Sequence, residues 1–395
     1  MTLSHAEPLA APTYTQITAC RSCGSSRWTN ILSLGDQYLI GFVRERNPLL
    51  PRCPLELIRC DECGLIQLKH SVDPELMWRD YGYRSSINAT MRAALADVVK
   101  DGMRYIRDGT WLDIGANDGA LLSNVASSFT KIAVEPARNL TAELEQVADT
   151  VIPDFFSAAA LDGRKCDVIT SCAMFYDLDD PNTFVADIAK TLSEDGVWMN
   201  QLSYTPTMLE QNAFDNIVHE HRCYYDLPTL DTIYRSRGLR IVEVSFNDVN
   251  GGSVRVAARH EPSGDFPIPP PVTLDQLTAF AARIKRWKNT MIELLDGRFL
   301  WGCGASTKGS VLLQYLGVSD YHLRGIGDRN PLKHGLMMPG VWSPIMSEEE
   351  MRKRKPDYLL VLPWSFADEI TARESALRST GTRLIYPLPD IRFVV

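Results

Sequence analysis

The sequence predicts an α/β protein with a doubly wound parallel sheet, a small cysteine-containing unit before it and a smaller Rossmann-like α/β unit after it. Three observations indicate this architecture. Short apolar runs alternate with helical patterns from about residue 105 to 260, a second such series follows residue 296, and two Cys-x-x-Cys pairs lie near the start. Strand–helix alternation of this kind is typical of a parallel sheet covered on both faces.

The length of 395 residues exceeds that of one ordinary core and predicts two or three domains. The clearest boundary is the segment 261–271, where four prolines within five residues exclude a helix. We therefore expect a zinc-binding domain over residues 1–75, a second domain over 76–260 and a third over 261–395.

Composition and charge narrow the class of partner. The formal net charge is −8, which disfavours nucleic acid, and no apolar run reaches the roughly 18 residues of a membrane span. The first residues lack the basic and apolar regions of a secretion signal, so we expect a soluble, cytoplasmic protein that binds neither nucleic acid nor membrane. The oligomeric state stays open, and a monomer would be compatible with the sequence.

In the middle domain, apolar runs at 111–114, 131–134, 167–170 and 197–202 predict strands, and 139–147 and 183–192 predict helices. The runs 240–246 and 253–258, joined through Asn250-Gly251-Gly252, predict an antiparallel pair that closes one edge of the sheet. In the last domain we expect a helix over 274–295, strands at 298–301, 323–326, 358–362 and 383–386, and a helix over 310–316.

Four cysteines are arranged as two Cys-x-x-Cys-Gly units, Cys20 with Cys23 and Cys60 with Cys63. Two residues between thiolates let a tight turn direct both sulfurs at one ion, and the following glycine permits a left-handed backbone. Two such turns predict a closed S4 site for structural Zn²⁺, whereas a redox role would not need a second copy. Cys53 has no partner at ligand spacing and is interpreted as a buried apolar side chain.

A glycine loop, Asp113-Ile114-Gly115-Ala116-Asn117-Asp118-Gly119, follows the first predicted strand and precedes a helical start at Ala120. Its glycines let the backbone turn sharply beside a ligand at the carboxyl edge of the sheet. The spacing differs from that of dinucleotide-binding and Walker loops. Asp113 suits a cationic ligand, and Glu135, at the end of the next strand, can accept both hydroxyls of a ribose. A glycine turn without a ligand is the alternative.

These features resemble the class I S-adenosylmethionine (SAM)-dependent methyltransferase fold. The resemblance implies SAM as the cofactor, with the glycine loop around its methionine part, Glu135 on the ribose and the segment Asp154-Phe155-Phe156 facing the adenine. The cofactor-binding residues that it implies are Tyr83, Ser86, Asp113, Gly115, Asn117, Gly119, Glu135, Asp154 and Phe155.

From Cys20 to the C-terminus the chain is similar to the nucleotide-sugar C-methyltransferases, three-domain enzymes that methylate a keto-deoxy sugar on a nucleoside diphosphate. The similarity rests on both cysteine pairs, the glycine loop and four further motifs: Tyr81-Gly82-Tyr83-Arg84-Ser85-Ser86, Glu220-His221, Gly302-Cys303-Gly304-Ala305-Ser306-Thr307-Lys308, and Asp328-Arg329-Asn330-Pro331-Leu332-Lys333 with Pro339-Gly340. It implies a nucleotide-sugar as the small-molecule partner.

The chemistry of that family needs a base that removes the proton beside a ketone, so that the enolate attacks the methyl group in line. His221 is the candidate by residue type and position. In an extended segment His219 would share its side while Glu220 faces the other, and each histidine could instead have a purely structural role. Tyr81 and Tyr176 complete the catalytic candidates.

Two departures from the characterised sugar C-methyltransferases concern the acceptor. Val218 stands where those enzymes have a tyrosine, and Ala173 and Asp177 stand where they have an asparagine and a histidine. Carbon methylation is therefore the preferred hypothesis, methylation of an oxygen on a sugar or another small anionic metabolite is the first alternative, and a non-catalytic zinc-ribbon scaffold is the second.

The last domain has a candidate binding site for the diphosphate of the nucleotide-sugar. Its loop enters the helix 310–316, and backbone N–H groups at a helix start attract anions. The candidate substrate-binding residues are Ser306, Thr307, Lys308, Asp328, Asn330 and Lys333. The alternative is a plain strand–helix turn.

Overall fold

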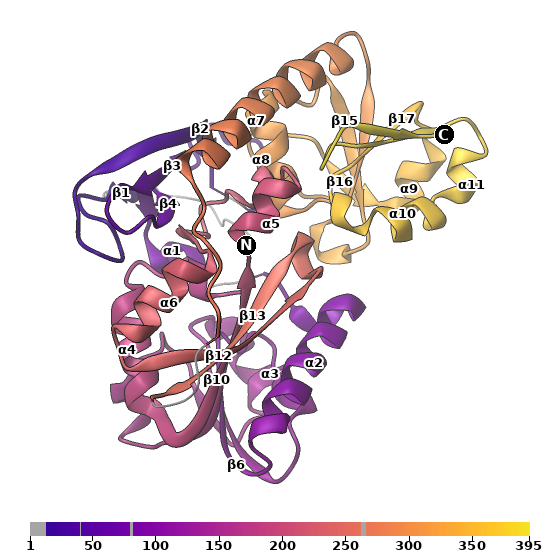
Figure 1. The fold of residues 1–395 in the computed structure, drawn as a ribbon. Helices are drawn as coiled ribbons and strands as arrows, with labels where there is room; N and C mark the ends of the chain where they lie inside the picture. Colours follow the sequence, from indigo (N-terminus) through magenta and orange to yellow (C-terminus); the bar gives the residue numbers. More distant parts are fainter. Residues whose placement is uncertain (1–12, 40, 80–81, 262–265) are drawn as a thin grey trace.

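The computed structural model describes residues 13–39, 41–79, 82–261 and 266–395. Tyr81, one of the catalytic candidates, lies outside these residues. Within them the chain forms sheets of seven, six, four and two strands. Figure 1 shows the seven-stranded sheet at the bottom, the N-terminal strands at the upper left and the C-terminal unit at the upper right.

The seven-stranded sheet has the order β12-β13-β10-β9-β6-β7-β8. Strands β10, β9, β6, β7 and β8 run parallel, whereas β13 runs antiparallel to β10 and β12. The parallel sheet with an antiparallel pair at one edge is thus confirmed. The bounds are β6 (Gly109–Ile114), β7 (Phe129–Val134), β8 (Thr150–Ile152), β9 (Cys166–Cys172), β10 (Leu192–Ser203), β12 (Leu239–Asn247) and β13 (Ser253–His260).

Helices cover both faces of this sheet, as expected from its apolar strands. Along β6, Trp111 packs in the cluster that holds α2 (Ala89–Tyr105), and Leu112 packs in the cluster on the other face with α4 (Pro181–Thr191) and α6 (Leu227–Arg235). This alternation follows from the two-residue period of a strand. In Figure 1, α2 and the pair α4 and α6 lie on opposite sides of the sheet.

Two expected helices are shorter in the structure. After the glycine loop only the 3₁₀ turn η2 (Leu122–Asn124) forms, because the Ser123 and Asn124 side chains donate to the carbonyl of Ala120 and compete with helical bonds. The helix expected over 139–147 consists of η3 (Arg138–Leu140) and α3 (Thr141–Leu144). It ends early because Asp149 already bonds to Lys131 and leads into β8.

The N-terminal unit joins its four-stranded sheet to a strand from the middle of the chain. β11 pairs with β4, so that the segment just after His221 is held against this unit. β1 and β5 form the two-stranded sheet. The bounds are β1 (Tyr14–Gln16), β2 (Trp28–Tyr38), β3 (Arg52–Cys60), β4 (Ile66–Leu68), β5 (His70–Val72), α1 (Pro74–Trp78), η1 (Ser85–Ile87) and β11 (Cys223–Tyr224).

The C-terminal unit contains the six-stranded sheet, in the order β16-β15-β14-β17-β18-β19, with the long helix α7 before it. All neighbouring strands are parallel except β18 and β19. The bounds are α7 (Leu274–Leu295), β14 (Leu300–Cys303), α8 (Thr307–Leu316), β15 (Leu323–Asp328), η8 (Pro331–Lys333), β16 (Ile345–Ser347), α9 (Glu348–Lys353), β17 (Tyr358–Val361), η9 (Trp364–Phe366), α10 (Ala367–Arg373), α11 (Ser375–Arg378), β18 (Arg383–Tyr386) and β19 (Arg392–Val394).

One hydrophobic cluster crosses all three units. It contains Leu57 from β3, Phe214 from η6 (Phe214–Asn216), Phe280 from α7 and Leu360 from β17. The N-terminal unit, too small to bury much core alone, therefore packs on the C-terminal unit. Among the described residues, every helix is too short or too polar to span a lipid bilayer.

Candidate active site

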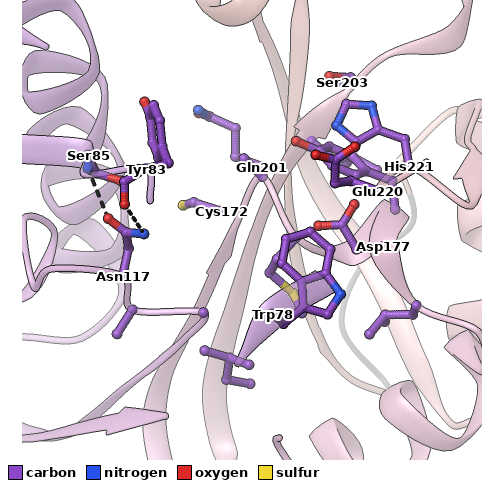
Figure 2. Close-up of a pocket in the computed structure, with 18 of the residues that line it drawn as sticks. Trp78, Tyr83, Ser85, Asn117, Cys172, Asp177, Gln201, Ser203, Glu220 and His221 are labelled. Carbon is purple, nitrogen blue, oxygen red and sulfur yellow. Dashed lines mark hydrogen bonds between the residues drawn. The ribbon is translucent and has the colours of Figure 1, made fainter. Parts of the chain in front are cut away.

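A cavity of about 440 Å³ opens at the carboxyl ends of the parallel strands, where open α/β sheets bind ligands. All three units contribute to its wall: Pro74 from the N-terminal unit, the strand ends and loops of the seven-stranded sheet, and Thr307 and Lys308 from α8. Figure 2 shows the glycine-loop side of the cavity facing Asp177, Glu220 and His221.

The glycine loop adopts a conformation that needs its glycines. Gly115 and Gly119 have φ values of +71° and +78°, in the left-handed region. Gly115 lines the cavity. Gly119 does not line it, and a Cβ atom there would lie 2.4 Å from Cγ2 of Val147, so this glycine allows close packing instead of ligand approach.

Glu135, at the end of β7, holds the loop. Its Oε2 accepts from the backbone N–H of Asn117 at 2.8 Å, and its Oε1 accepts from that of Ala137 at 2.9 Å. Burial raises the pKa of this carboxyl group, and the two bonds oppose that rise. Each carboxylate oxygen keeps a further acceptor site, so Glu135 could bind the two hydroxyls of a ribose.

Asn117 connects the loop to the segment before α2. Its side-chain oxygen accepts from the backbone N–H of Ser85 at 2.9 Å, and its amide donates to the carbonyl of Tyr83 at 3.2 Å, as Figure 2 shows. Tyr83 and Asn117 both line the cavity. Ser86 does not, and its backbone N–H donates to Asp118 at 3.0 Å.

Asp113 is the penultimate residue of β6 and lines the cavity. Its Oδ1 accepts from the hydroxyl of Thr170 at 2.6 Å. Burial raises the pKa of Asp113 to about 7, the Thr170 bond lowers it and the charge of Glu135 raises it further. A cation nearby would stabilise the ionised form, so this carboxylate suits the positive charge of SAM.

We expect SAM to bind more tightly as the pH rises from 5.5 to 8. Asp113, with its pKa near 7, is protonated at the lower pH and ionised at the higher, and only the carboxylate attracts a cation. The affinity should rise roughly tenfold, with release of a proton. Isothermal titration calorimetry in buffers of different ionisation enthalpy measures both quantities.

The matched variants are Asp113→Asn, which should flatten this pH dependence, and Glu145→Gln, an exposed carboxyl group outside the cavity, which should preserve it. An unchanged slope in Asp113→Asn would remove Asp113 from contact with the cation.

Two adjacent residues, Asp154 and Phe155, are candidates for binding the adenine of the cofactor, and only one of them lines the cavity. Phe155 lines the cavity and lies under the Arg79 guanidinium, 4.8 Å from its ring centroid. Asp154 does not line the cavity, and it forms an ion pair with Arg79 at 3.0 Å. Asp154 would therefore act on the cofactor only through Arg79 and Phe155.

His221 lies on the opposite side of the cavity. Its Nδ1–H donates to the carbonyl of Asn216 at 2.9 Å, and its ring packs on Tyr176 with centroids 4.1 Å apart. This tautomer leaves the lone pair on Nε2. Burial and then the charge of Lys308 lower the pKa of His221 to about 3, which makes the imidazole neutral at physiological pH.

Glu220 and Asp177 also face the cavity, and Figure 2 shows their carboxyl groups side by side. Burial raises the pKa of Glu220 to about 7, and burial and then the charge of Glu220 raise the pKa of Asp177 well above its usual value. Glu220 Oε2 and Asp177 Oδ1 have no hydrogen-bond partner in the structure. Each carboxyl group can therefore accept a hydrogen bond from a ligand, and it can donate one when it is protonated.

The expected arrangement of the two histidines is wrong. His219 is 2% exposed, lies outside the cavity and donates from Nε2 to the carbonyl of Cys53 at 2.8 Å. Glu220 and His221 share the cavity instead. The physical reason is a turn, in which the N–H of His221 bonds to the carbonyl of Val218, so the two-residue alternation of an extended strand does not apply.

The candidate substrate residues of the C-terminal unit divide into two groups. Thr307 and Lys308 line the cavity. Ser306 caps α8 by accepting from Gly309, and Asp328 accepts from the N–H of Ala305 at 2.7 Å. Lys333 donates to Asp328 at 3.2 Å, and Asn330 accepts from the N–H of Leu332. Ser306, Asp328, Asn330 and Lys333 all lie outside the cavity.

The four paired cysteines come together as expected, with all Sγ atoms within 4.8 Å of one another. The distances are 3.6 Å between Cys20 and Cys63 and 3.5 Å between Cys23 and Cys60. A tetrahedral S4 site with Zn–S bonds of 2.3 Å has sulfurs about 3.8 Å apart, so the residues fit Zn²⁺. The unpaired Cys53 is buried in a separate apolar cluster.

The first cysteine turn is linked to the cavity wall through Arg21, which lies between Cys20 and Cys23. Arg21 donates from Nε to Asp179 at 3.2 Å, and Asp179 forms a second ion pair with Arg222, next to His221. Asp179 and Arg222 both line the cavity. The metal-binding turn therefore helps to position the wall that carries His221.

Sequence reasoning missed several wall residues. Cys172, Gln201 and Ser203 lie at the ends of β9 and β10, and the rule that ligands bind at carboxyl strand ends could have identified them. Trp78 and Asn250 have no comparable signal, because they reach the cavity from α1 and from η7 (Val249–Gly251).

Comparison with known proteins assigns all three parts of the chain. Residues 20–78 match a zinc binding domain, residues 83–244 match a methyltransferase domain, and residues 248–389 match a C-methyltransferase C-terminal domain. The C-methyltransferase NovU of Streptomyces niveus is 30% identical over 417 residues, which cover 96% of this chain and 97% of NovU.

Solved structures of methyltransferases are similar over part of the chain. A SAM-dependent methyltransferase of Clostridium acetobutylicum ATCC 824 is 13% identical, covers 44% of this chain and 92% of its own, and gives a TM-score of 0.36. Magnesium protoporphyrin IX methyltransferase (ChlM) of Synechocystis PCC 6803, with bound SAH, is 14% identical, covers 44% and 88%, and also gives 0.36.

The fold is that of a class I methyltransferase with an N-terminal zinc-binding domain, and its cofactors are SAM and zinc. The alternative of a non-catalytic scaffold is thereby set aside. Because NovU matches nearly the whole chain at this identity, the protein belongs to its family of SAM-dependent C-methyltransferases.

Proposed function

We propose that the enzyme methylates a carbon atom of a keto-deoxy sugar linked to a nucleoside diphosphate, through an enolate. The observation that carries this proposal is His221, which lines the cavity and whose Nδ1–H is held by the Asn216 carbonyl. A neutral imidazole with a lone pair on Nε2 is the form that can remove a proton. The match to a C-methyltransferase over the whole chain supports carbon as the acceptor.

SAM supplies an electrophilic methyl group when it is bound. The chain's own residues then have separate tasks. Asp113, Asn117 and Glu135 would hold and orient the donor along the glycine loop, with Gly115, Tyr83 and Phe155 around it. On the other side, His221 would accept the proton at Nε2, and Tyr176 would hold the imidazole ring from its face. Placing the two reactants in line provides much of the rate enhancement.

Each of the three units would bind a different component of the reaction or its structural metal. We propose residues 1–75, 76–260 and 261–395 as the zinc-binding, donor-binding and nucleotide-binding domains. The cavity volume of about 440 Å³ lies within the usual range of roughly 300–1,000 Å³ for small-molecule sites. Thr307 and Lys308 give the nucleotide-sugar a route from this cavity towards Ser306, Asp328, Asn330 and Lys333.

Solvent exchange tests the proposal. A panel of thymidine, uridine, guanosine and cytidine diphosphate 4-keto-6-deoxyhexoses is incubated with the enzyme in deuterated water without SAM. Deuterium at the carbon beside the ketone, detected by mass spectrometry and NMR, is the expected result. No exchange with any member, together with methylation of a hydroxyl once SAM is added, would contradict carbon transfer.

Methylation of a hydroxyl oxygen is the second candidate function, and one observation favours it. The unpartnered oxygens of Asp177 and Glu220 face the cavity beside His221, and a sugar hydroxyl could donate to either. Val218 and Ala173, where characterised sugar C-methyltransferases have polar side chains, also line this wall.

A further inference from the structure

Lys308 belongs to the C-terminal unit but lines the same cavity as His221. Its Nζ donates to the carbonyl of Asn250, in η7 of the methyltransferase part, at 2.7 Å. Among the described residues, no carboxylate lies within ion-pair distance of Lys308. An ammonium group has three donors, so Lys308 keeps hydrogens for a ligand.

The only other arginine or lysine of the described residues in the cavity wall is already engaged. Arg222 pairs with Asp179 and donates to the carbonyl of Val72. A negative charge that forms on an acceptor beside His221 therefore has one cation available to it, the ammonium of Lys308.

A buried carboxyl group, that of Asp215, lies in η6, which contacts the helix α8 that carries Lys308. Asp215 is 0% exposed; its Oδ2 accepts from the indole N–H of Trp364 at 2.7 Å, and its Oδ1 has no hydrogen-bond partner. A buried carboxylate with a free oxygen is costly unless a positive charge compensates it. Lys308 provides that charge, since burial raises the pKa of Asp215 and Lys308 lowers it, while burial lowers the pKa of Lys308 and Asp215 raises it.

One 3₁₀ turn, η6, positions both groups. The carbonyl of Asn216 fixes His221, and η6, which also carries Asp215, contacts α8, which carries Lys308. The charged or titratable groups near the imidazole include Lys308 and, from the same cavity wall, Glu220, Asp177 and Tyr176. A small second pocket that His221 also lines adds Tyr204, Cys223 and Tyr224. Two successive residues of one turn thus act on the two groups, Asn216 through a hydrogen bond to His221 and Asp215 through its charge on Lys308.

We propose that Lys308 is a catalytic residue that stabilises the enolate oxygen of the acceptor, and that Asp215 is a positioning residue that keeps its ammonium charged and directed into the cavity. This inference rests on the proposed carbon methylation. It gives the C-terminal unit a part in the chemistry beyond binding the nucleotide.

The step balances without a further reactant. The C–H bond beside the ketone breaks, its proton moves to Nε2 of His221, and its electron pair forms the enolate, whose oxygen faces Lys308. The enolate carbon then forms the bond to the methyl group while the bond from that methyl to the sulfur of SAM breaks, and the sulfur keeps the electron pair as SAH. The imidazolium finally releases its proton to water.

The test compares Lys308→Met with wild type in the donor-free deuterium exchange, using the panel member that wild type exchanges fastest. We expect exchange to fall by roughly 10²-fold, because removal of one oxyanion donor typically costs 10²–10³-fold. SAH affinity should not change. Lys285→Met, an exposed lysine on α7, is the control and should exchange at the wild-type rate.

The outcomes separate the two ideas. If wild type exchanges and the folded Lys308→Met variant matches it, this inference is overturned and carbon methylation stands. If wild type exchanges no member of the panel, the proposed function fails and this inference fails with it. Should Lys308→Met not fold, Lys308→Gln, which keeps a donor without the charge, is measured in its place with the same expectation.

A titration gives a readout that a purely structural lysine would not move. Because Lys308 lowers the pKa of His221, NMR of histidine labelled with ¹³C and ¹⁵N should show that pKa rising in Lys308→Met. The charge of Asp215 raises the pKa of Lys308, so the substitution Asp215→Asn should lower that pKa. The alkaline limb of the activity–pH profile should then move to lower pH. An unmoved limb in a folded Asp215→Asn enzyme would remove Asp215 from the positioning role.

Discussion

Replacement of His221 by alanine is expected to lower the turnover number by roughly 10²-fold or more, because a general base typically contributes 10²–10⁴-fold. Donor affinity should remain, since Tyr83 and Asn117, two of the residues expected to hold SAM, lie across the cavity from His221 (Figure 2). Steady-state kinetics and calorimetry with SAH measure the two effects separately.

The control for this substitution is His322→Ala, in the C-terminal unit away from the cavity, where the side chain lies near Ser319. Its turnover should equal that of wild type. A His221→Ala enzyme with wild-type turnover would exclude His221 as the base and direct attention to the neighbouring carboxyl groups of Glu220 and Asp177.

Replacement of Cys60 by serine is expected to remove bound zinc and most of the folded protein. Binding of Zn²⁺ to a closed structural site contributes directly to folding, with apparent values of about 10–16 kcal/mol in zinc-finger peptides. The loss should reach the cavity, because Arg21, between two of the ligands, bonds to Asp179 beside Arg222. Zinc content by mass spectrometry and the thermal unfolding midpoint are the measurements.

Cys166→Ser is the matched control, since this thiol is equally buried but lies in β9, far in sequence from the four ligands. It should keep one zinc ion per chain. If Cys60→Ser yielded a zinc-free protein with the melting temperature of wild type, the four cysteines would have no structural role.

Most strands of both α/β units could be predicted from local sequence, because a buried parallel strand needs a continuous apolar run. The short strands β8, β16 and β19 were not among those expected. The run at 111–114 became β6 and the run at 383–386 became β18. Helix lengths were less predictable. The segment 139–147 has a helical pattern, but a bond between Asp149 and Lys131 ends the helix after Leu144, and no local pattern reveals such a bond.

The same contrast applies to the two histidines. Residue type identified His219 and His221 as candidates, and an extended backbone would have put them on one side. A turn at Val218 and a bond to the carbonyl of Cys53 in the N-terminal unit separate them instead. Contacts between units, distant in sequence, therefore selected which histidine faces the cavity.

By itself the sequence determined the fold class, the zinc ligands, the glycine loop and the resemblance to C-methyltransferases, because each depends on neighbouring residues at short spacing. Only the tertiary structure decided that Lys308, Pro74 and His221 share one cavity. They come from three units, and their meeting depends on a common hydrophobic core and on β11 pairing with β4. Packing of this kind minimises exposed apolar area over the whole chain, so no local stretch of sequence records it.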